Sequence, residues 1–270
     1  MTTDKSFQDY VPVDQWPSVS TMLDGFGDQT LPASPALAAT NVTLSGEDGR
    51  SFTIAFRDDS SLTWTVDAAT DNPESVEATY KAIEARPGIF IIDFVHGAGR
   101  QMRDVTVVLN QNTGAATVAV SALHEQDGAV KGSTEFTHAR AEGTEAAFHQ
   151  RSAGLVGKRI YYRYSDVEAY EHIYLTPGTF VWHCLRGGEK GLADVDRTLA
   201  FEVAEDLYLF FWTERVMTVE SVLLVDLREQ RSIGRMFGWD DTTDEPLVLP
   251  FNSRLTVMNT TEYPQDHTKH

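Results

Sequence analysis

The sequence predicts an all-β protein made of two diverged copies of one antiparallel β unit, of the barrel or sandwich type. Short segments with alternating apolar side chains succeed one another from residue 41 onward, and turns rich in Gly, Asn and Asp separate them. The second half of the chain repeats the first at a spacing of 118 residues. With 270 residues, the chain is long enough for two domains that each bury a core.

Residues 1–40 are expected to form an arm or lid, because they show little periodicity and contain four prolines. Within this arm, Trp16, Met22, Leu23 and Phe26 predict one short amphipathic turn that packs on the next part of the chain. At the other end of the chain, residues 264–270 are polar and are expected to form a loose tail.

The first domain, residues 41–150, contains several segments in which apolar side chains recur at every second position. A strand places alternate side chains on opposite faces, so this pattern predicts half-buried strands. Such strands are expected at 51–56 and 62–66. A fully buried strand is expected at 88–94, and further strands are expected at 105–109 and 116–120. Residues 73–86 are the one stretch of this domain with a weak helical pattern.

The second domain, residues 151–263, aligns with the first when the chain is shifted by 118 residues. This shift places Trp64 on Trp182, and it places His96 on Glu214 at the end of an apolar strand. Around Gly49 the best match, to Gly157, needs a shift of only 108 residues. We therefore expect the first domain to lack one strand, the counterpart of residues 170–175.

Aromatic residues share faces of the expected strands in the second domain. Tyr162 and Tyr164 share one face of the first of these strands. Tyr170, His172 and Tyr174 share one face of the next. On a later strand, one face holds Tyr208, Phe210 and Trp212, and Glu214 follows them. The result is an aromatic wall that ends in a carboxylate, which either caps a strand at the rim or lies in a pocket. A polar loop at 187–197 and a last hairpin, 221–226 with 232–237, complete this domain.

The chain is strongly acidic, with 40 Asp and Glu residues against 22 Lys and Arg, a formal charge of −18 and a pI of about 4.7. Such a surface repels phosphate groups, so neither nucleic acid nor an anionic membrane is expected as a partner. No run approaches the roughly 18 apolar residues of a membrane span, and the start shows no signal peptide. Because Cys184 is the single cysteine, no intrachain disulfide can form, and a cytoplasmic location is expected.

Several motifs are specific enough to indicate a family. They are Leu155–Arg159, Tyr164–Ser165, Tyr170–Leu175, Trp182–Leu185, Glu189–Asp194, Asp206–Phe210 and Val225–Leu227. Together they resemble the carboxy-terminal domain of the molybdenum cofactor biosynthesis protein F (MoaF-like) family. The first half of the chain, arm included, is similar to the amino-terminal domain of that family through Asp24–Phe26 and Ile89–Phe94. The resemblance implies two calycin-type, lipocalin-like β-barrels in tandem.

A tyrosine pair at Tyr162 and Tyr164, with Tyr170 on the next strand and Glu214 further on, is similar to the pattern of phenolic acid decarboxylases. These are small lipocalin-like barrels that bind hydroxycinnamates with such tyrosines and a glutamate deep in the barrel. The arginine of that family has no counterpart here, because its position falls near Leu192. This departure puts recognition of a carboxylate, and hence decarboxylation, in doubt.

Small closed barrels enclose a ligand between inward-facing side chains. The candidate catalytic residues are Glu214, Tyr162, Tyr164 and Tyr170, and the candidate ligand-binding residues are Tyr174, His172, Trp182, Phe210, Trp212 and Arg235. A buried carboxyl group has a raised pKa and moves protons near neutral pH. Two simpler interpretations stay open: the tyrosines are ordinary strand packing, or Glu214 forms a surface ion pair with Arg215 or Arg163.

A metal site would need His172 and His183 to face each other from adjacent strands. The third ligand would have to be Asp194 or Asp196 in the loop after them. The sequence therefore predicts no metal, and it predicts no cofactor. Cys184 is expected to be a buried, small apolar residue, because no His and Asp relay is recognisable around it.

The sequence favours binding of a small, largely apolar, aromatic or phenolic molecule inside the second barrel, with acid–base chemistry by Glu214 and the tyrosines. The reaction class would be a cofactor-free lyase, hydratase or isomerase. A non-catalytic carrier or sensor is the alternative, and an interaction module with barrels filled by side chains is a third. Since Ile54 and Phe56 stand at its tyrosine positions, the first domain is expected to be a support, with His96 as the one reason to keep a second site open. A homodimer is retained as a hypothesis about assembly.

Overall fold

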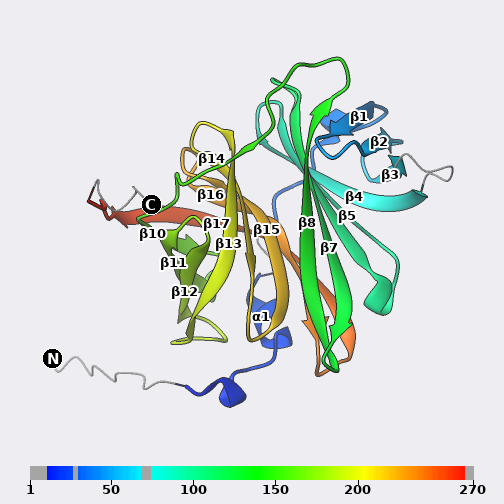
Figure 1. Ribbon diagram of the computed structural model, residues 1–270. Helices are drawn as coiled ribbons and strands as arrows, with labels where there is room; N and C mark the ends of the chain where they lie inside the picture. Colours follow the sequence, from blue (N-terminus) through cyan, green and yellow to red (C-terminus); the bar gives the residue numbers. More distant parts are fainter. Residues whose placement is uncertain (1–10, 27–29, 68–73, 265–270) are drawn as a thin grey trace.

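The computed structural model describes residues 11–26, 30–67 and 74–264, apart from the side chains of residues 22–24 and 74. Most of this chain is β-strand, arranged as two closed antiparallel barrels in tandem (Figure 1). The prediction of an all-β protein with two lipocalin-like barrels is therefore confirmed.

The strands of the first barrel succeed one another round it in sequence order. They are β1 (Asn41–Gly46), β2 (Ser51–Phe56), β3 (Ser61–Asp67), β4 (Glu74–Arg86), β5 (Ile89–His96), β6 (Arg103–Asn110), β7 (Ala115–Gln126) and β8 (Ala129–Ala141). Pairing of β8 with β1 closes the ring. Short 3-10 turns, η3 (Pro35–Leu37) and η4 (Gly99–Gln101), precede β1 and β6. Because alternate side chains point inward, Phe52, Ile54 and Phe56 of β2 lie in the core of this barrel.

The second barrel has the same order of strands. They are β10 (Lys158–Arg163), β11 (Ala169–Thr176), β12 (Thr179–Arg186), β13 (Ala193–Ala204), β14 (Leu207–Thr213), β15 (Thr218–Asp226), β16 (Arg231–Asp240) and β17 (Glu245–Thr260). Pairing of β17 with β10 and of β12 with β13 completes the ring. A two-residue strand, β9 (Gln150–Arg151), adds to the edge of β13.

The two barrels agree in register as well as in strand order. Trp64 of β3 lies opposite Ile54 of β2, and Trp182 of β12 lies opposite His172 of β11. The same shift of 118 residues relates both members of the two pairs. This equivalence confirms that Trp64 and Trp182 occupy corresponding places in two copies of one unit.

Two details of the sequence-based prediction were wrong. The segment predicted as weakly helical is the strand β4, in which Tyr80 and Ala82 point into the first barrel. The first barrel also does not lack a strand, because β1 is the counterpart of β10 and β2 is the counterpart of β11. Gly49 and Gly157 misled the alignment because each adopts a positive φ, of 86° and 82°, in a turn that precedes a different strand.

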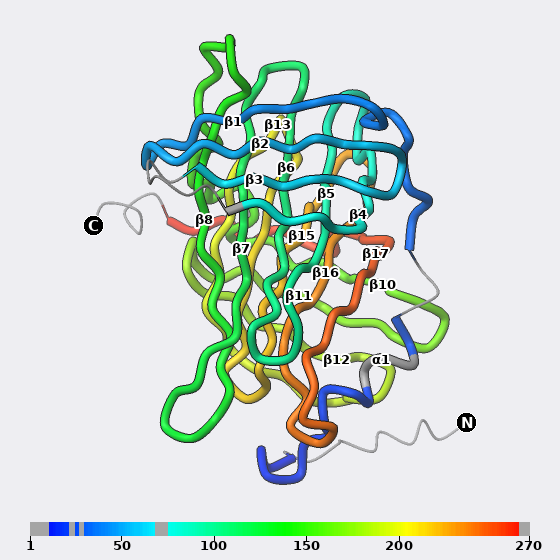
Figure 2. Tube along the Cα trace, turned by 90° about the vertical axis from the view of Figure 1, so that its right-hand side faces the viewer, coloured from blue at the N-terminus to red at the C-terminus, as the bar shows by residue number. Residues whose placement is uncertain are grey.

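The first part of the amino-terminal arm packs on the second barrel, although the first barrel comes directly after the arm in the sequence, while Leu37 near the end of the arm is buried in the first barrel. It contains η1 (Val13–Gln15) and α1 (Ser20–Phe26), which lie at the end of the molecule near β12 and away from β1–β3 (Figures 1 and 2). Val19 and Phe26 are buried in the core of the second barrel, and Trp16 packs against it. The predicted turn also included Met22 and Leu23, whose side chains lie outside the described residues, as does the tail from residue 265.

The barrels touch each other through the outer faces of their strands. In β14, Leu209 and Phe211 point out into a core shared with the first barrel, while Phe210 and Trp212 point into the second barrel. The strand is therefore buried on both faces, which explains why its sequence is apolar at successive positions.

Polar side chains inside this interface link the two barrels. Arg235 was predicted to bind ligand, but the structure places it here, with its Nε 2.6 Å from Oδ2 of Asp104 and both side chains fully buried. Because β16 alternates, Met236 and not Arg235 faces the lumen. A second buried pair joins β4 to β15, where Arg86 donates from Nε and Nη2 to the carboxylate of Asp226 at 2.9 and 2.6 Å.

Candidate functional site

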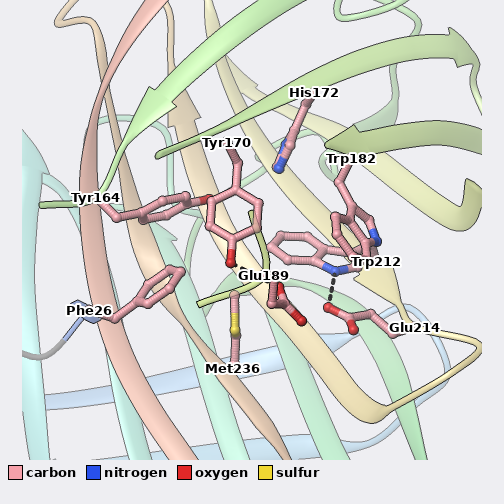
Figure 3. Close-up of a pocket in the computed structure, with 9 residues that line it drawn as sticks. All are labelled: Phe26, Tyr164, Tyr170, His172, Trp182, Glu189, Trp212, Glu214 and Met236. Carbon is pink, nitrogen blue, oxygen red and sulfur yellow. Dashed lines mark hydrogen bonds between the residues drawn. The ribbon is translucent and has the colours of Figure 1, made fainter. Parts of the chain in front are cut away.

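The lumen of the second barrel is packed with aromatic rings and keeps one small cavity. Its volume is about 20 Å³, close to the space that a single water molecule needs. The residues that line it are Phe26, Tyr164, Tyr170, His172, Trp182, Glu189, Trp212, Glu214 and Met236 (Figure 3). Aromatic walls therefore meet two carboxyl groups in one small cavity.

Six of these nine lining residues were predicted from the sequence: Tyr164, Tyr170, His172, Trp182, Trp212 and Glu214. Strand parity explains this agreement. Tyr170 and His172 are two residues apart on β11, and Trp182 lies opposite His172 on β12. Glu214 comes directly after β14 and continues the inward face that holds Trp212.

Three other predicted residues, Tyr162, Tyr174 and Phe210, lie in the core of the same barrel but do not line the cavity. The hydroxyl groups of Tyr162 and Tyr174 are hydrogen-bonded to each other at 2.5 Å. Burial raises the pKa of both phenols, which keeps them neutral. These side chains support the wall of the lumen and do not face its empty part.

The carboxyl group of Glu214 reaches the cavity. Oε1 accepts a hydrogen bond from Nε1 of Trp212 at 3.3 Å, while Oε2 is buried and has no hydrogen-bond partner among the described residues. The residue as a whole is half-buried, but its exposed part does not include Oε2. Burial raises the pKa of Glu214 well above its usual value, and the nearby carboxyl groups of Glu189 and Asp196 raise it further.

The alternative of a surface ion pair at Glu214 finds no support among the described residues. Arg163, one proposed partner, pairs with Asp166 instead. The other, Arg215, has a backbone N–H that donates to Asp196.

Glu189 is the functional candidate that the sequence did not reveal. It belongs to the loop between β12 and β13, yet only 2% of it is exposed. The hydroxyl of Tyr170 donates to Oε2 of Glu189 at 2.8 Å, and Oε1 is buried without a partner among the described residues. Burial raises the pKa of Glu189 to about 7, against the lowering effect of the Tyr170 hydrogen bond, and Glu168 adds to the increase.

A third buried glutamate, Glu168, holds this loop in place. Its Oε1 accepts a hydrogen bond from the backbone N–H of Gly188 at 2.9 Å. A Cβ atom at Gly187 or at Gly25 of the arm would overlap the Glu168 side chain. The two glycines therefore let the loop and the arm approach the mouth of the barrel closely.

The histidine pair that would have suggested a metal does not form. His172 points into the lumen, and burial lowers its pKa to about 3, so its imidazole is neutral. His183 lies on the opposite face of the sheet, where its Nδ1 is 2.9 Å from Oε1 of Glu171. Within the described residues, no three His, Cys, Asp or Glu side chains are grouped so that they could hold a metal ion.

Two other residues of this region, Asp196 and Cys184, have structural roles. Asp196, which belongs to β13 and not to a loop, accepts a hydrogen bond from Nε1 of Trp182 at 2.8 Å, and burial raises its pKa to about 6. Cys184 is fully buried in the core, as predicted, and burial raises the pKa of its thiol to about 12. The thiol is accordingly a poor nucleophile.

The first barrel offers no comparable site among its described residues. Its interior is an apolar cluster, and its hollow of about 450 Å³ lies at the rim near β1 and the turn from β6 to β7. His96 does not line this hollow. Under the corrected alignment, Ile54 and Phe56 correspond to His172 and Tyr174 of the second barrel.

The arm supplies part of the cavity wall. The ring of Phe26 lies 4.6 Å from that of Tyr164 and 5.9 Å from that of Tyr170, and Trp16 meets Trp182 edge-on at 5.7 Å. A molecule larger than water therefore fits only when a side chain such as Phe26 makes room.

Two family models match the chain, and a curated protein matches most of it. The model of the MoaF N-terminal domain matches residues 14–125, and the model of the MoaF C-terminal domain matches residues 149–261. The protein MoaF of Klebsiella aerogenes is 30% identical over 263 residues, which cover 92% of this chain and 97% of that protein.

A crystal structure from Burkholderia vietnamiensis, described as that of a β-lactamase, is also similar. It is 18% identical, with a TM-score of 0.34, and the match covers 40% of this chain and 100% of that chain. A similarity of this size carries no argument about activity. Among the residues that the structure describes, no helix has the length and apolar character of a membrane span.

Proposed function

The chain belongs to the MoaF family, and from the geometry of its second barrel we propose that it binds a small, largely apolar aromatic molecule there and transfers a proton on it. The observation that carries the proposal is the pair of carboxyl groups, Glu189 and Glu214, in a cavity walled by aromatic rings. Neither group forms an ion pair among the described residues, and burial raises the pKa of both. Carboxyl groups of this kind are suited to general acid–base catalysis near neutral pH.

The two carboxyl groups would act as general acid and general base, according to which of them is protonated. The neutral one donates a proton to the ligand, and the ionised one accepts a proton from it, so that the pair as a whole keeps its charge. Tyr164 and Tyr170 would orient a polar group of the ligand, since burial keeps both phenols protonated. The reaction class is that of a cofactor-free lyase, hydratase or isomerase.

A non-catalytic carrier or sensor is the second candidate, and the small size of the cavity favours it. The lumen is filled with aromatic rings and would open only when a ligand binds. Such a lumen would hold the ligand tightly and release it slowly, which disfavours rapid turnover. In both cases the first barrel is a support. A cytoplasmic location and a homodimer stay predictions.

The first experiment is a screen of phenolic and hydroxycinnamate compounds by thermal shift and by the fluorescence of Trp182 and Trp212. A binding compound raises the melting temperature and changes the emission of these indoles. Glu214→Gln then separates the two candidates: a catalyst loses turnover and keeps its ligand affinity within about tenfold. Turnover that survives in Glu214→Gln shows that Glu214 is not the catalytic group, whereas a ligand that binds to the native protein without any turnover leaves the carrier. Glu202→Gln, a change of an exposed glutamate on β13, is the matched control.

A further inference from the structure

The cavity of the second barrel contains two carboxyl oxygens that lack a partner among the described residues. They are Oε1 of Glu189 and Oε2 of Glu214, and both are buried. The other oxygen of each group already accepts a hydrogen bond, from Tyr170 and from Trp212. A buried polar atom without a partner costs free energy, and an unpaired buried charge costs more. A ligand that donates hydrogen bonds to both oxygens would remove this cost.

The charges around the cavity determine whether it favours a cationic or an anionic ligand. The groups that raise the pKa of Glu189 and Glu214 are other acidic side chains: Glu168, Asp194, Asp196 and, for Glu214, Glu189 itself. Two nearby arginines lower the pKa of other carboxyl groups: Arg186 lowers that of Glu168, and Arg215 lowers that of Asp196. The surroundings are therefore acidic, and they attract a cation and repel an anion.

Apart from Met236, the remaining wall of the cavity is aromatic. Tyr164, Tyr170, Trp182 and Trp212 present their rings to it (Figure 3). The face of an aromatic ring carries partial negative charge and attracts a cation within about 6 Å, most strongly in a site without water. The carboxyl groups and the aromatic rings thus both favour a cationic ligand.

We propose that the ligand of this site is an organic ammonium ion with an aromatic body, a proposal that rests on the function proposed above. Its ammonium group would lie between Glu189 and Glu214, and its three N–H donors would serve the two partnerless oxygens and a ring face or the hydroxyl oxygen of Tyr170. One ionised and one neutral carboxyl group balance the single positive charge. The pair then needs no arginine.

Phe26 marks the place of the aromatic body. Its ring is 1% exposed and lies within 6.3 Å of the rings of Tyr164, Tyr170 and Phe251. It comes from the arm and not from the barrel, and it lines the same cavity as the two carboxyl groups. A ligand ring in its position would keep these ring contacts while an alkyl link reaches the carboxyl groups.

Three probes of similar shape test the charge: 2-phenylethylamine, 2-phenylethanol and phenylacetate, which are cationic, neutral and anionic near pH 7. Isothermal titration should show the amine binding at least about tenfold more tightly than the alcohol, and phenylacetate binding least. Amine binding should also release protons, measured in two buffers of different ionisation enthalpy, because the bound cation ionises a carboxyl group that is partly protonated. The alcohol should release none.

Substitutions in the cavity test whether the probes bind there. Glu189→Gln and Glu214→Gln should each weaken the amine about tenfold and leave the alcohol nearly unchanged. Phe26→Ala should strengthen the binding of both, since it empties the position of the ligand ring. Glu202→Gln, an exposed change in the same barrel, should alter neither probe.

The outcomes separate this inference from the proposed function. If the alcohol or phenylacetate binds as tightly as the amine, the inference is wrong and an aromatic site remains. If the amine binds equally well to the double variant Glu189→Gln with Glu214→Gln, it binds to the acidic surface and the inference is also wrong. If no probe and no phenolic compound binds to the native chain or to Phe26→Ala, both proposals are wrong.

Discussion

At the scale of single residues, the buried carboxyl group of Glu189 links stability to pH. Its pKa rises from 4.5 to about 7 in the folded protein, which means that the folded state binds this proton more tightly than the unfolded chain. The contribution of the group to stability is therefore greatest below the unfolded pKa and is lost as the pH rises towards the folded pKa.

Glu189→Gln removes this dependence, because glutamine keeps the size of the side chain and does not ionise. At about pH 8 the variant should exceed the native protein in free energy of unfolding by up to about 3 kcal/mol, and near pH 4 the two should be nearly equal. Urea unfolding at both pH values measures the difference. An equal effect at both pH values would show that the pKa of Glu189 does not change on folding, and Glu202→Gln provides the control.

Single residues also show where sequence reasoning works. Glu214 was found because it continues the alternation that holds Trp212, and alternation fixes which side chains enter a barrel. Glu189 was missed because it lies in a loop, where no period applies and burial depends on how the loop folds back. Its local signal is the pair of glycines before it: a Cβ atom at Gly187 would overlap Glu168, and a Cβ atom at Gly188 would lie 3.1 Å from Thr21 of the arm.

At the scale of elements, the arm is a wall of the site, and Gly25 controls how closely it approaches. A Cβ atom at Gly25 would overlap Cγ of Glu168. Helix propensity alone favours alanine over glycine by roughly 1 kcal/mol, so an exposed helical glycine gains from this change. The contact with Glu168 predicts the opposite sign.

Gly25→Ala should therefore lower the free energy of unfolding by about 1–3 kcal/mol, the usual cost of an overpacked site. It should also speed cleavage of the arm in limited proteolysis. Gly178→Ala is the matched control, because a Cβ atom there meets nothing within 4 Å, and its effect should be small. A stabilised Gly25→Ala protein would contradict the close packing of arm and barrel.

Elements differ in how well the sequence predicts them. Strands such as β2 and β12 were recognised because large apolar side chains occupy every second position. The strand β4 was taken for a weak helix because most of its inward residues, such as Ala78 and Ala82, are small and only Tyr80 is large. For the same reason β8 gave no strand signal, although it closes the first barrel against β1.

At the scale of the whole molecule, the sequence predicted two barrels but not how they join. Arg235 was predicted to bind ligand, and only the packing of its strand on Asp104 shows its role. Likewise, Val19 and Phe26 of the arm precede the first barrel in sequence and are buried in the second. Contacts of this kind depend on the final packing, which no local period encodes.

The ion pair of Arg86 with Asp226 tests whether the barrels unfold as one unit. The pair crosses the interface, with 7% and 1% of the two side chains exposed, and Arg86 also donates to the backbone oxygens of Glu205 and Asp206. Arg86→Met would leave Asp226 as a buried charge without its partner, which typically costs about 3–5 kcal/mol. We expect calorimetry to show one transition for the native protein and two for this variant, because the barrels lose one of the two buried ion pairs that link them.

Two further variants distinguish this loss from a general effect of removing an arginine. Arg57→Met breaks an exposed pair with Glu77 on the first barrel and should cost only about 0–1 kcal/mol. In the double variant, Asp226→Asn added to Arg86→Met should restore part of the stability, because asparagine is neutral and still accepts the hydrogen bonds from the backbone N–H groups of Arg228 and Glu229. If Arg86→Met and Arg57→Met cost the same, the buried pair of Arg86 with Asp226 adds nothing to the coupling of the barrels.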